Sequence, residues 1–258
     1  MARKARRQSE SGIYHIVMRG INRQDIFHDE EDYWRFLETL TRAKPDNNFE
    51  LHGFCLMSNH VHLLIQERDE VVPKIMQRIG TRYAWWYNHK YERSGHVFQG
   101  RYGSECVEDD EYLLTVIRYI HNNPVKAGMV SKPEDYRWSS INVYYGKHQY
   151  PAGLTDTSFI LGIVAPEPAQ AIRRFREFMN MENQDTCLEY EIKLRKTDDE
   201  VKAEIDEILK GNPVTALHSM KKQERDILLR QIKAIEGATQ RQIARVTGLN
   251  QNLIFRSK

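Results

Sequence analysis

The hydrophobic and polar positions of residues 1–145 follow two different periods. Short runs of β-branched and aromatic residues predict strands, and apolar residues that recur every three or four positions predict helices. The predicted strands are residues 13–19, 49–57, 60–66 and 97–107, and the predicted helices are residues 29–43, 72–91 and 109–123. The order β-α-β-β-α-β-α predicts an α+β fold with a ferredoxin-like (RRM-like) antiparallel sheet, helices on one face and one extra helix.

Proline and glycine interrupt this pattern. Pro45 and Pro124 are predicted to end two of the helices, because a proline removes a helical hydrogen bond. Residues 146–170 are rich in both residue types, which predicts a linker or covering segment. The sequence therefore predicts a first domain of residues 1–145 and an all-α C-terminal domain of residues 171–258.

The 258-residue chain has a net formal charge of only +2, but its charges are unevenly placed. Residues 182–210 hold ten acids and five bases, whereas residues 221–258 hold nine bases and three acids. Four more bases lie at the start of the chain, namely Arg3, Lys4, Arg6 and Arg7. Basic charge on both sides of an acidic stretch indicates a polyanionic partner, and ordinary solvated faces would give the same pattern.

The cysteine pattern and the absence of long apolar runs indicate the cellular compartment of the protein. The three cysteines are far apart and form no CxxC pair, which is typical of a reducing environment. The polar first residues lack the apolar core of a signal peptide, and no apolar run has the length of a membrane span. These features predict a cytoplasmic protein with no membrane partner.

His60 and His62 flank Val61 in a predicted strand. Side chains alternate across a strand, so the two imidazoles point to one face and can hold one divalent ion. Two unrelated histidines would give the same motif. Tyr119 and Asn123 lie four residues apart on a predicted helix and share a face. Asn123 can offer its carbonyl oxygen as a third ligand, with the Tyr119 phenol beside the ion; a half-buried aromatic and a helix-terminal asparagine are the structural alternatives.

Six blocks of the chain carry a resemblance to a known family. They are YHIVMRG at 14–20, NRQDIF at 22–27, MSNHVHLL at 57–64, FQGRY at 98–102, RYIHNNPVKAG at 118–128 and YRWSS at 136–140. In this order they resemble the single-strand transposases of the HUH tyrosine class, most closely the REP-associated tyrosine transposases. The resemblance implies that His60 and His62 bind the metal, that Tyr119 is the nucleophile and that Asn123 is the ligand on the helix.

The resemblance also implies the chemistry and the partners. Mg²⁺ or Mn²⁺ would polarise the scissile phosphate, and Tyr119 would attack phosphorus to give a 5′-phosphotyrosine and a free 3′-hydroxyl. The partners would be single-stranded and hairpin DNA, bound by a monomer or a homodimer. Arginines in the matching blocks are candidate phosphate contacts, namely Arg19, Arg23 and Arg101. Nearby aromatics can stack on unpaired bases or pack in the core, namely Trp85, Trp86 and Tyr87.

Residues 221–258 are predicted to contain a helix-turn-helix that binds duplex DNA. A small residue, a turn glycine and a hydrophobe fall at the spacing that this unit needs, at Ala244, Gly248 and Ile254. The segment resembles the helix-turn-helix of bacterial regulators, and a plain helical hairpin is the alternative. Its second helix carries residue types that read base edges, at Asn250, Gln251, Asn252 and Arg256.

Together these patterns predict a transposase, that is, a metal-dependent single-stranded DNA endonuclease and strand transferase that acts at hairpin-forming repeats. Two other functions stay open at this point. One is a DNA-binding regulator with a residual transposase domain. The other is a metal hydrolase that acts through water, which would not need Tyr119.

Overall fold

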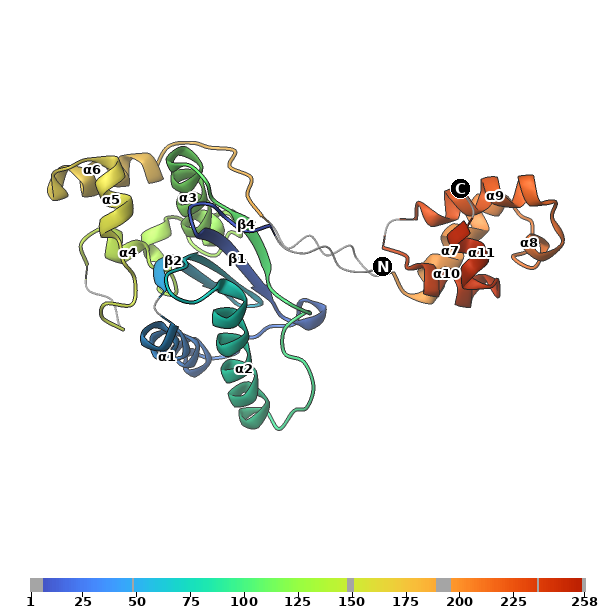
Figure 1. Ribbon diagram of the computed structural model, residues 1–258, viewed down its shortest axis with the longest axis horizontal. Coiled ribbons are helices and arrows are strands. Elements are labelled where there is room, and N and C mark those ends of the chain that lie inside the picture. Colours follow the sequence, from blue (N-terminus) through green and yellow to red (C-terminus); the bar gives the residue numbers. More distant parts are fainter. Residues whose placement is uncertain (1–6, 48, 148–150, 189–195, 236, 257–258) are drawn as a thin grey trace. The chain divides into compact units, whose positions relative to one another are not determined.

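The computed structural model describes residues 7–47, 49–147, 151–188, 196–235 and 237–256. Contacts divide the chain into two compact units, Met1–Tyr190 and Glu191–Lys258 (Figure 1). Within the described part of the chain, no helix combines the length and the apolar character that crossing a membrane requires.

The first unit is built on a four-stranded antiparallel sheet with the order β2-β3-β1-β4. The strands are β1 (Ile13–Arg19), β2 (Glu50–Met57), β3 (His60–Gln66) and β4 (Gly103–Cys106). The predicted strand over residues 97–107 is wrong in its first half, where only a single bridge joins Phe98 to Gly20. The backbone at Gly100 has a φ of 65°, which leaves the extended conformation and delays the strand until Gly103.

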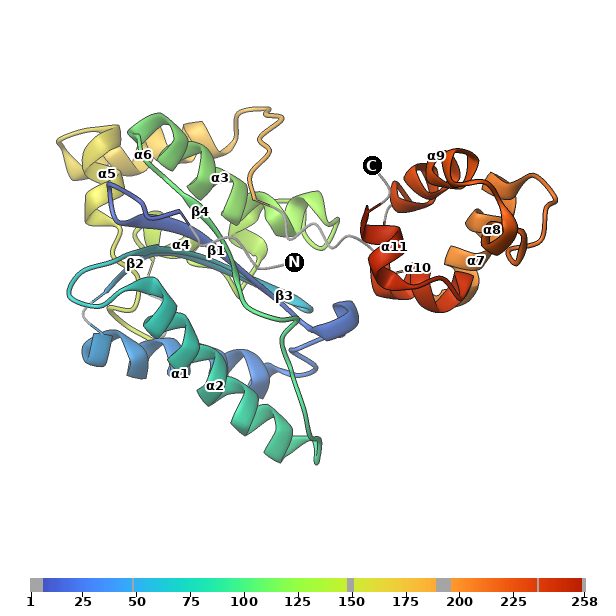
Figure 2. The ribbon, with the colours of Figure 1, turned by 45° about the vertical axis from the view of Figure 1, so that its right-hand side comes forward.

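Three long helices cover the two faces of the sheet, namely α1 (Glu30–Asn47), α2 (Val72–Lys90) and α3 (Asp110–Lys126). Helices α1 and α2 lie on one face and α3 lies on the other (Figure 2). Two apolar cores follow from this arrangement: Ile16 packs with α1 and α2, whereas Leu64 packs with Ile117 of α3. The predicted antiparallel sheet with helices is confirmed.

Two predicted helix ends are wrong. Helix α1 continues past Pro45 to Asn47, and α3 continues past Pro124 to Lys126. Both prolines lie in the last turn, where each removes a single backbone hydrogen bond. Pro124 is buried, so apolar packing offsets that loss.

The first unit extends beyond the predicted domain end at residue 145. It includes α4 (Ile141–Tyr144), α5 (Ser158–Val164) and α6 (Pro168–Met179), with short 3₁₀ turns at Ile21–Arg23 and Pro133–Asp135. The ring of Phe175 stacks on Tyr144 at 4.6 Å between centres, in the same core as α3. The segment 146–170, predicted as a linker or a covering segment, carries the helix α5 of the first unit.

In the part of the second unit that the structure describes, the regular secondary structure is helical. They are α7 (Asp198–Leu209), α8 (Ala216–Ser219), α9 (Lys222–Lys233), α10 (Gln240–Thr247) and α11 (Gln251–Arg256). Ile205, Leu229 and Ile254 belong to its apolar core. The hydroxyl of Thr239 accepts a hydrogen bond from the backbone of Gln242 and caps α10.

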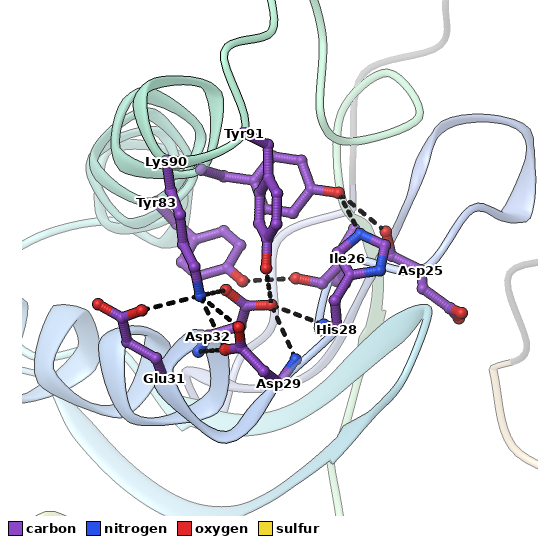
Figure 3. Close-up of polar contacts among 10 residues, drawn as sticks. Asp25, Ile26, His28, Asp29, Glu31, Asp32, Tyr83, Lys90 and Tyr91 are labelled. Atoms are coloured by element: carbon purple, nitrogen blue, oxygen red, sulfur yellow. Dashed lines mark hydrogen bonds and ion pairs between the residues drawn. The ribbon is translucent and has the colours of Figure 1, made fainter.

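A polar cluster ties the start of α1 to the end of α2 (Figure 3). The Lys90 ammonium lies 2.7 Å from Asp29 and 2.8 Å from Asp32. The fully buried carboxylate of Asp32 also accepts hydrogen bonds from the Tyr91 hydroxyl at 2.7 Å and from the backbone of His28 at 2.6 Å. This cluster fixes the two helices against each other, because a buried charge must be paired.

The substitution Asp32→Ala should lower the free energy of unfolding by about 3 kcal/mol, because it removes the buried partner of Lys90 and unpairs the groups around it. The control is Glu31→Ala, whose carboxylate lies 2.9 Å from the same ammonium but is 69% exposed. That control should cost at most about 1 kcal/mol. Urea denaturation measures both values, and equal losses would contradict the role of the cluster.

Candidate active site

Polar side chains gather on the sheet face that α3 covers. In the pairing of β1 with β3, Arg19 lies opposite His60 and Val17 lies opposite His62. Directly opposed residues of an antiparallel pair point to the same side. Arg19, His60 and His62 therefore share one face, and His15, two residues before Val17, shares it as well.

The structure brings Tyr119 of α3 to this group. The ring centre of Tyr119 lies 5.8 Å from that of His62 and 6.0 Å from that of His15. The rings of His60 and His62 lie 5.0 Å apart. Because Tyr119 and Asn123 are one helical turn apart, Asn123 follows on the same side of α3.

The hydrogen bonds of each proposed ligand leave one of its atoms with a lone pair that can bind a metal ion. Nδ1 of His60 lies 2.6 Å from the amide oxygen of Asn59, which can only accept, so Nδ1 carries the proton and Nε2 keeps a lone pair. Nδ1 of His62 lies 3.0 Å from Nε2 of His15. Asn123 donates its amide nitrogen to the carbonyl of Tyr119 at 2.9 Å, a bond that does not use its Oδ1.

The electrostatic setting favours the neutral form of both histidines. Burial, with a contribution from Arg19, lowers the pKa of His60 to about 4. Burial also lowers the pKa of His62 well below its usual range, helped by His15, His60 and Arg19. Neutral imidazole is the form that binds metal. Two imidazole nitrogens and an amide oxygen are a donor set that fits a divalent ion.

Tyr119 has a cation beside it that the sequence reasoning missed. The Lys126 ammonium lies 4.8 Å from the centre of the Tyr119 ring and donates to the carbonyl of Asp185 at 2.8 Å. A nearby cation favours the ionised form of a phenol. The spacing of seven residues on one helix was the available signal, since it places both side chains on one face.

His121 is adjacent to this group in sequence but has no part in it. It is fully buried, and its Nε2 lies 2.8 Å from the hydroxyl of Ser140. Burial lowers the pKa of His121 to about 3. Its surroundings are those of a core histidine.

A second group of potential ligands lies at the other end of the β2–β3 hairpin. Ligand atoms of Glu50, His52 and Asp156 lie within 4.8 Å of one another. However, the two His52 nitrogens lie 3.1 Å from the side-chain oxygen of Gln66 and 3.2 Å from the carbonyl of Asp156. Glu50 also pairs with Arg68 at 2.9 Å. These atoms already have hydrogen-bonding partners, so the His60–His62 pair is the better candidate for a metal.

The candidate DNA contacts fall into different surroundings. A groove of about 690 Å³ lies between α2 and residues 95–102, and its lining includes Arg19, Arg101 and Trp85. The Trp85 side chain is 67% exposed, whereas Tyr87 is buried with its hydroxyl donating to the carbonyl of Asp25. Trp86 is half-buried against the core, and Arg23 is exposed on the turn after β1. Of the three aromatics, Trp85 is therefore the one available for stacking.

In the second unit, Asn250, Gln251 and Asn252 are exposed at the start of α11. The backbone of Arg256 ends this helix, but its side chain lies outside the described residues. The basic residues Arg3, Lys4 and Arg6 also lie outside the described part of the chain.

Comparison with known proteins finds a family model that matches part of the first unit. Residues 8–123 match the model of the family described as "Transposase IS200 like". A curated relative from Haemophilus influenzae, named a REP-associated tyrosine transposase, is 29% identical over 115 residues. The match covers 40% of this chain, and the chain spans 65% of the length of that relative.

Two solved structures are also similar. A REP-associated tyrosine transposase bound to a REP hairpin aligns with a TM-score of 0.50 at 19% identity, over 60% of this chain and 94% of that chain. This likeness supports the fold. A transposase from Deinococcus radiodurans aligns with a TM-score of 0.34 at 20% identity, over 46% of this chain and 96% of that chain.

The buried His121 gives the stability of the protein a pH dependence. Its folded pKa of about 3 lies below the unfolded value of about 6.5, so the unfolded chain binds more protons as the pH falls. Its stabilising contribution is therefore present above pH 6.5 and is lost on acidification. Between pH 7 and pH 5 the wild type should lose about 2 kcal/mol more than His121→Gln, measured by urea denaturation in EDTA. Parallel pH profiles would contradict this.

Proposed function

We propose that the chain is an HUH-type tyrosine transposase that cleaves and rejoins single-stranded DNA, and the match of residues 8–123 to the family model described as "Transposase IS200 like" supports this proposal. The observation that carries the proposal is the approach of Tyr119 to His62, with ring centres 5.8 Å apart. The strand order and the helix that follows β4 agree with a ferredoxin-like fold carrying one extra helix.

The proposed metal ligands are Nε2 of His60, Nε2 of His62 and Oδ1 of Asn123. They would hold Mg²⁺ or Mn²⁺, and imidazole donors suit Mn²⁺ better than Mg²⁺. When bound, the ion would act as a Lewis acid on the scissile phosphate. Arg19, which lies opposite His60 in the sheet, would hold the same phosphate by its charge.

Tyr119 is the proposed nucleophile. Its phenol oxygen would attack phosphorus and form a P–O bond, while the bond to the 3′ oxygen breaks and releases a 3′-hydroxyl. The phenol must lose a proton, because its ordinary pKa is near 10. Lys126 would stabilise the phenolate from its position 4.8 Å from the ring centre. Rejoining would need no nucleotide cofactor, because the 5′-phosphotyrosine is itself a phosphodiester.

The proposed substrate is single-stranded DNA beside a hairpin-forming repeat. The structurally similar REP-associated transposase is bound to a REP hairpin, which supports this choice. Arg19 lines the groove beside α2 and lies opposite His60 in the sheet, so it is a residue that the groove and the proposed metal site share, although α2 and α3 cover opposite faces of the sheet. We infer that the single-stranded DNA continues into this groove, where Arg101 would contact a phosphate and Trp85 would stack on a base.

We propose that the second unit binds duplex DNA through a helix-turn-helix formed by α10 and α11. Gly248 adopts a φ of 70° between the two helices, as a tight turn requires. Asn250, Gln251 and Asn252 are exposed where a recognition helix reads bases. This observation also supports the second candidate function, a DNA-binding regulator with a residual transposase domain.

Incubation with end-labelled hairpin DNA and Mn²⁺ tests the nucleophile. The wild type should form a covalent adduct that survives denaturing electrophoresis, and Tyr119→Phe should reduce its formation by about 10³-fold or more. The control is Tyr145→Phe, because the Tyr145 hydroxyl is buried and makes no hydrogen bond to any residue that the structure describes, so its removal should not change the yield.

The other outcomes distinguish the alternatives. An adduct that persists in Tyr119→Phe would exclude this tyrosine. Cleavage without an adduct in Tyr119→Phe would favour a hydrolase that acts through water. A wild type that forms no adduct on any hairpin but binds duplex DNA tightly would favour the regulator.

The groove is tested by single-stranded DNA binding. Trp85→Ala should weaken binding by about 1–3 kcal/mol, because one base loses its stacking partner, whereas Trp85→Phe should keep most of the affinity. Phe159→Ala removes an aromatic of the first unit that is 40% exposed outside the groove and should leave the dissociation constant unchanged. Fluorescence anisotropy measures all four proteins. Equal effects of Trp85→Ala and Phe159→Ala would contradict the groove.

A further inference from the structure

His15 is a fully buried histidine in the central strand β1, and no step proposed above uses it. Its Nε2 lies 3.0 Å from Nδ1 of His62, and the two rings are stacked with centres 5.3 Å apart. On the opposite side, its Nδ1 lies 3.7 Å from Oε2 of Glu105. Three residues on three adjacent strands therefore form a line that ends at His62.

The sheet register explains this line. Glu105 lies directly opposite His15 in the pairing of β1 with β4, so their side chains point to the same side. His62 lies opposite Val17 in the pairing of β1 with β3, which is one step along the same face from His15. The contact follows from backbone pairing.

The two contacts indicate where the protons lie. Oε2 of Glu105 is beyond hydrogen-bond distance of Nδ1 of His15 at 3.7 Å, but its negative charge favours the tautomer of neutral His15 that carries the proton on Nδ1. Nε2 of His15 then keeps a lone pair and accepts the Nδ1 proton of His62. With its proton on Nδ1, His62 keeps its lone pair on Nε2, which is the atom proposed as the metal ligand. The N–H groups of both histidines therefore point the same way, from His62 toward His15 and from His15 toward the carboxylate of Glu105.

Glu105 is itself held in place. The backbone nitrogen of Leu188 donates to its Oε2 at 3.0 Å. His15 is the main reason that the pKa of Glu105 lies below its usual range, so the group is a carboxylate at neutral pH. A side chain that is 33% exposed and yet fixed by a backbone donor is suited to orient a buried partner.

We propose that Glu105 and His15 are positioning residues that fix the tautomer and the ring orientation of His62 for binding a divalent cation. The inference rests on the proposed metal site and does not depend on Tyr119. Outer partners of metal-binding histidines generally contribute about 10- to 100-fold to metal affinity.

The test is the affinity of the full-length, DNA-free protein for Mn²⁺, measured by isothermal titration calorimetry. Glu105→Gln should weaken Mn²⁺ binding by about 10- to 100-fold. The amide group of glutamine can donate a hydrogen bond to Nδ1 of His15, which favours the opposite tautomer of His15 and, through it, of His62. The control is Glu111→Gln, the same change on an exposed residue in the first turn of α3. It should leave the affinity unchanged.

A second variant and a second measurement guard against a purely structural effect. His15→Phe keeps an aromatic ring but removes both nitrogens, and should weaken Mn²⁺ binding at least as much as Glu105→Gln. In metal-free protein, the ¹⁵N shifts of His62 report its tautomer. The wild type and Glu111→Gln should show the Nδ1-protonated form, and Glu105→Gln should show a shift toward the Nε2-protonated form.

The outcomes separate this inference from the proposed function. Mn²⁺ affinity that is unchanged in His62→Ala would overturn the proposed metal site. A His62 tautomer that is unchanged in Glu105→Gln would overturn the positioning role, whatever the metal result. Equal losses of Mn²⁺ affinity in Glu105→Gln and Glu111→Gln would also overturn it.

Discussion

The antiparallel pairing of β1 with β3 is the constraint on which the rest of the site depends. It sets Arg19 opposite His60 and Val17 opposite His62, and so places a cation and two imidazoles on one face of the sheet. A slip of one residue would turn the β3 side chains to the other face. There the imidazoles would meet the apolar core around Ile16, with no partner for their nitrogens. The apolar residues between the histidines therefore specify the position of the polar ones.

Close packing of α3 on the sheet completes the arrangement. A Cβ atom on Gly53 of β2 would lie 2.4 Å from Cδ1 of Ile117, so glycine at this position permits the close approach of the helix. Outside the apolar contact, Arg118 pairs with Asp185 at 2.6 Å, with side chains only 13% and 10% exposed. These contacts hold the helix that carries Tyr119 next to the histidines. The proposed nucleophile and the proposed metal ligands come from elements far apart in the chain, and the packed sheet brings them together.

The sequence predicted well the strands and helix faces that depend only on residues close together in the chain. The strands over residues 13–19 and 60–66 have their predicted bounds, because apolar runs with turn residues after them define a strand locally. The sharing of one helix face by Tyr119 and Asn123 is likewise a local property. Where packing overrides a local rule, prediction was wrong: Pro45 and Pro124 lie inside helices, and the strand predicted from residue 97 begins at Gly103.

Contacts between side chains on different strands could not be predicted from the sequence. Nothing in the spacing of His15, His62 and Glu105 indicates that they meet, because their contact depends on the registers of two strand pairs. The choice between Trp85 and Tyr87 is similar. Both belong to one aromatic cluster in the sequence, and the position of α2 on the sheet decides that Tyr87 is buried and Trp85 exposed.

A crystal structure of the protein soaked with Mn²⁺, with data collected for anomalous scattering from manganese, shows directly whether His60 and His62 hold the ion. We expect an anomalous peak within about 2.3 Å of Nε2 of both His60 and His62, on the side of the sheet that α3 covers. A peak among Glu50, His52 and Asp156, with none between His60 and His62, would contradict it.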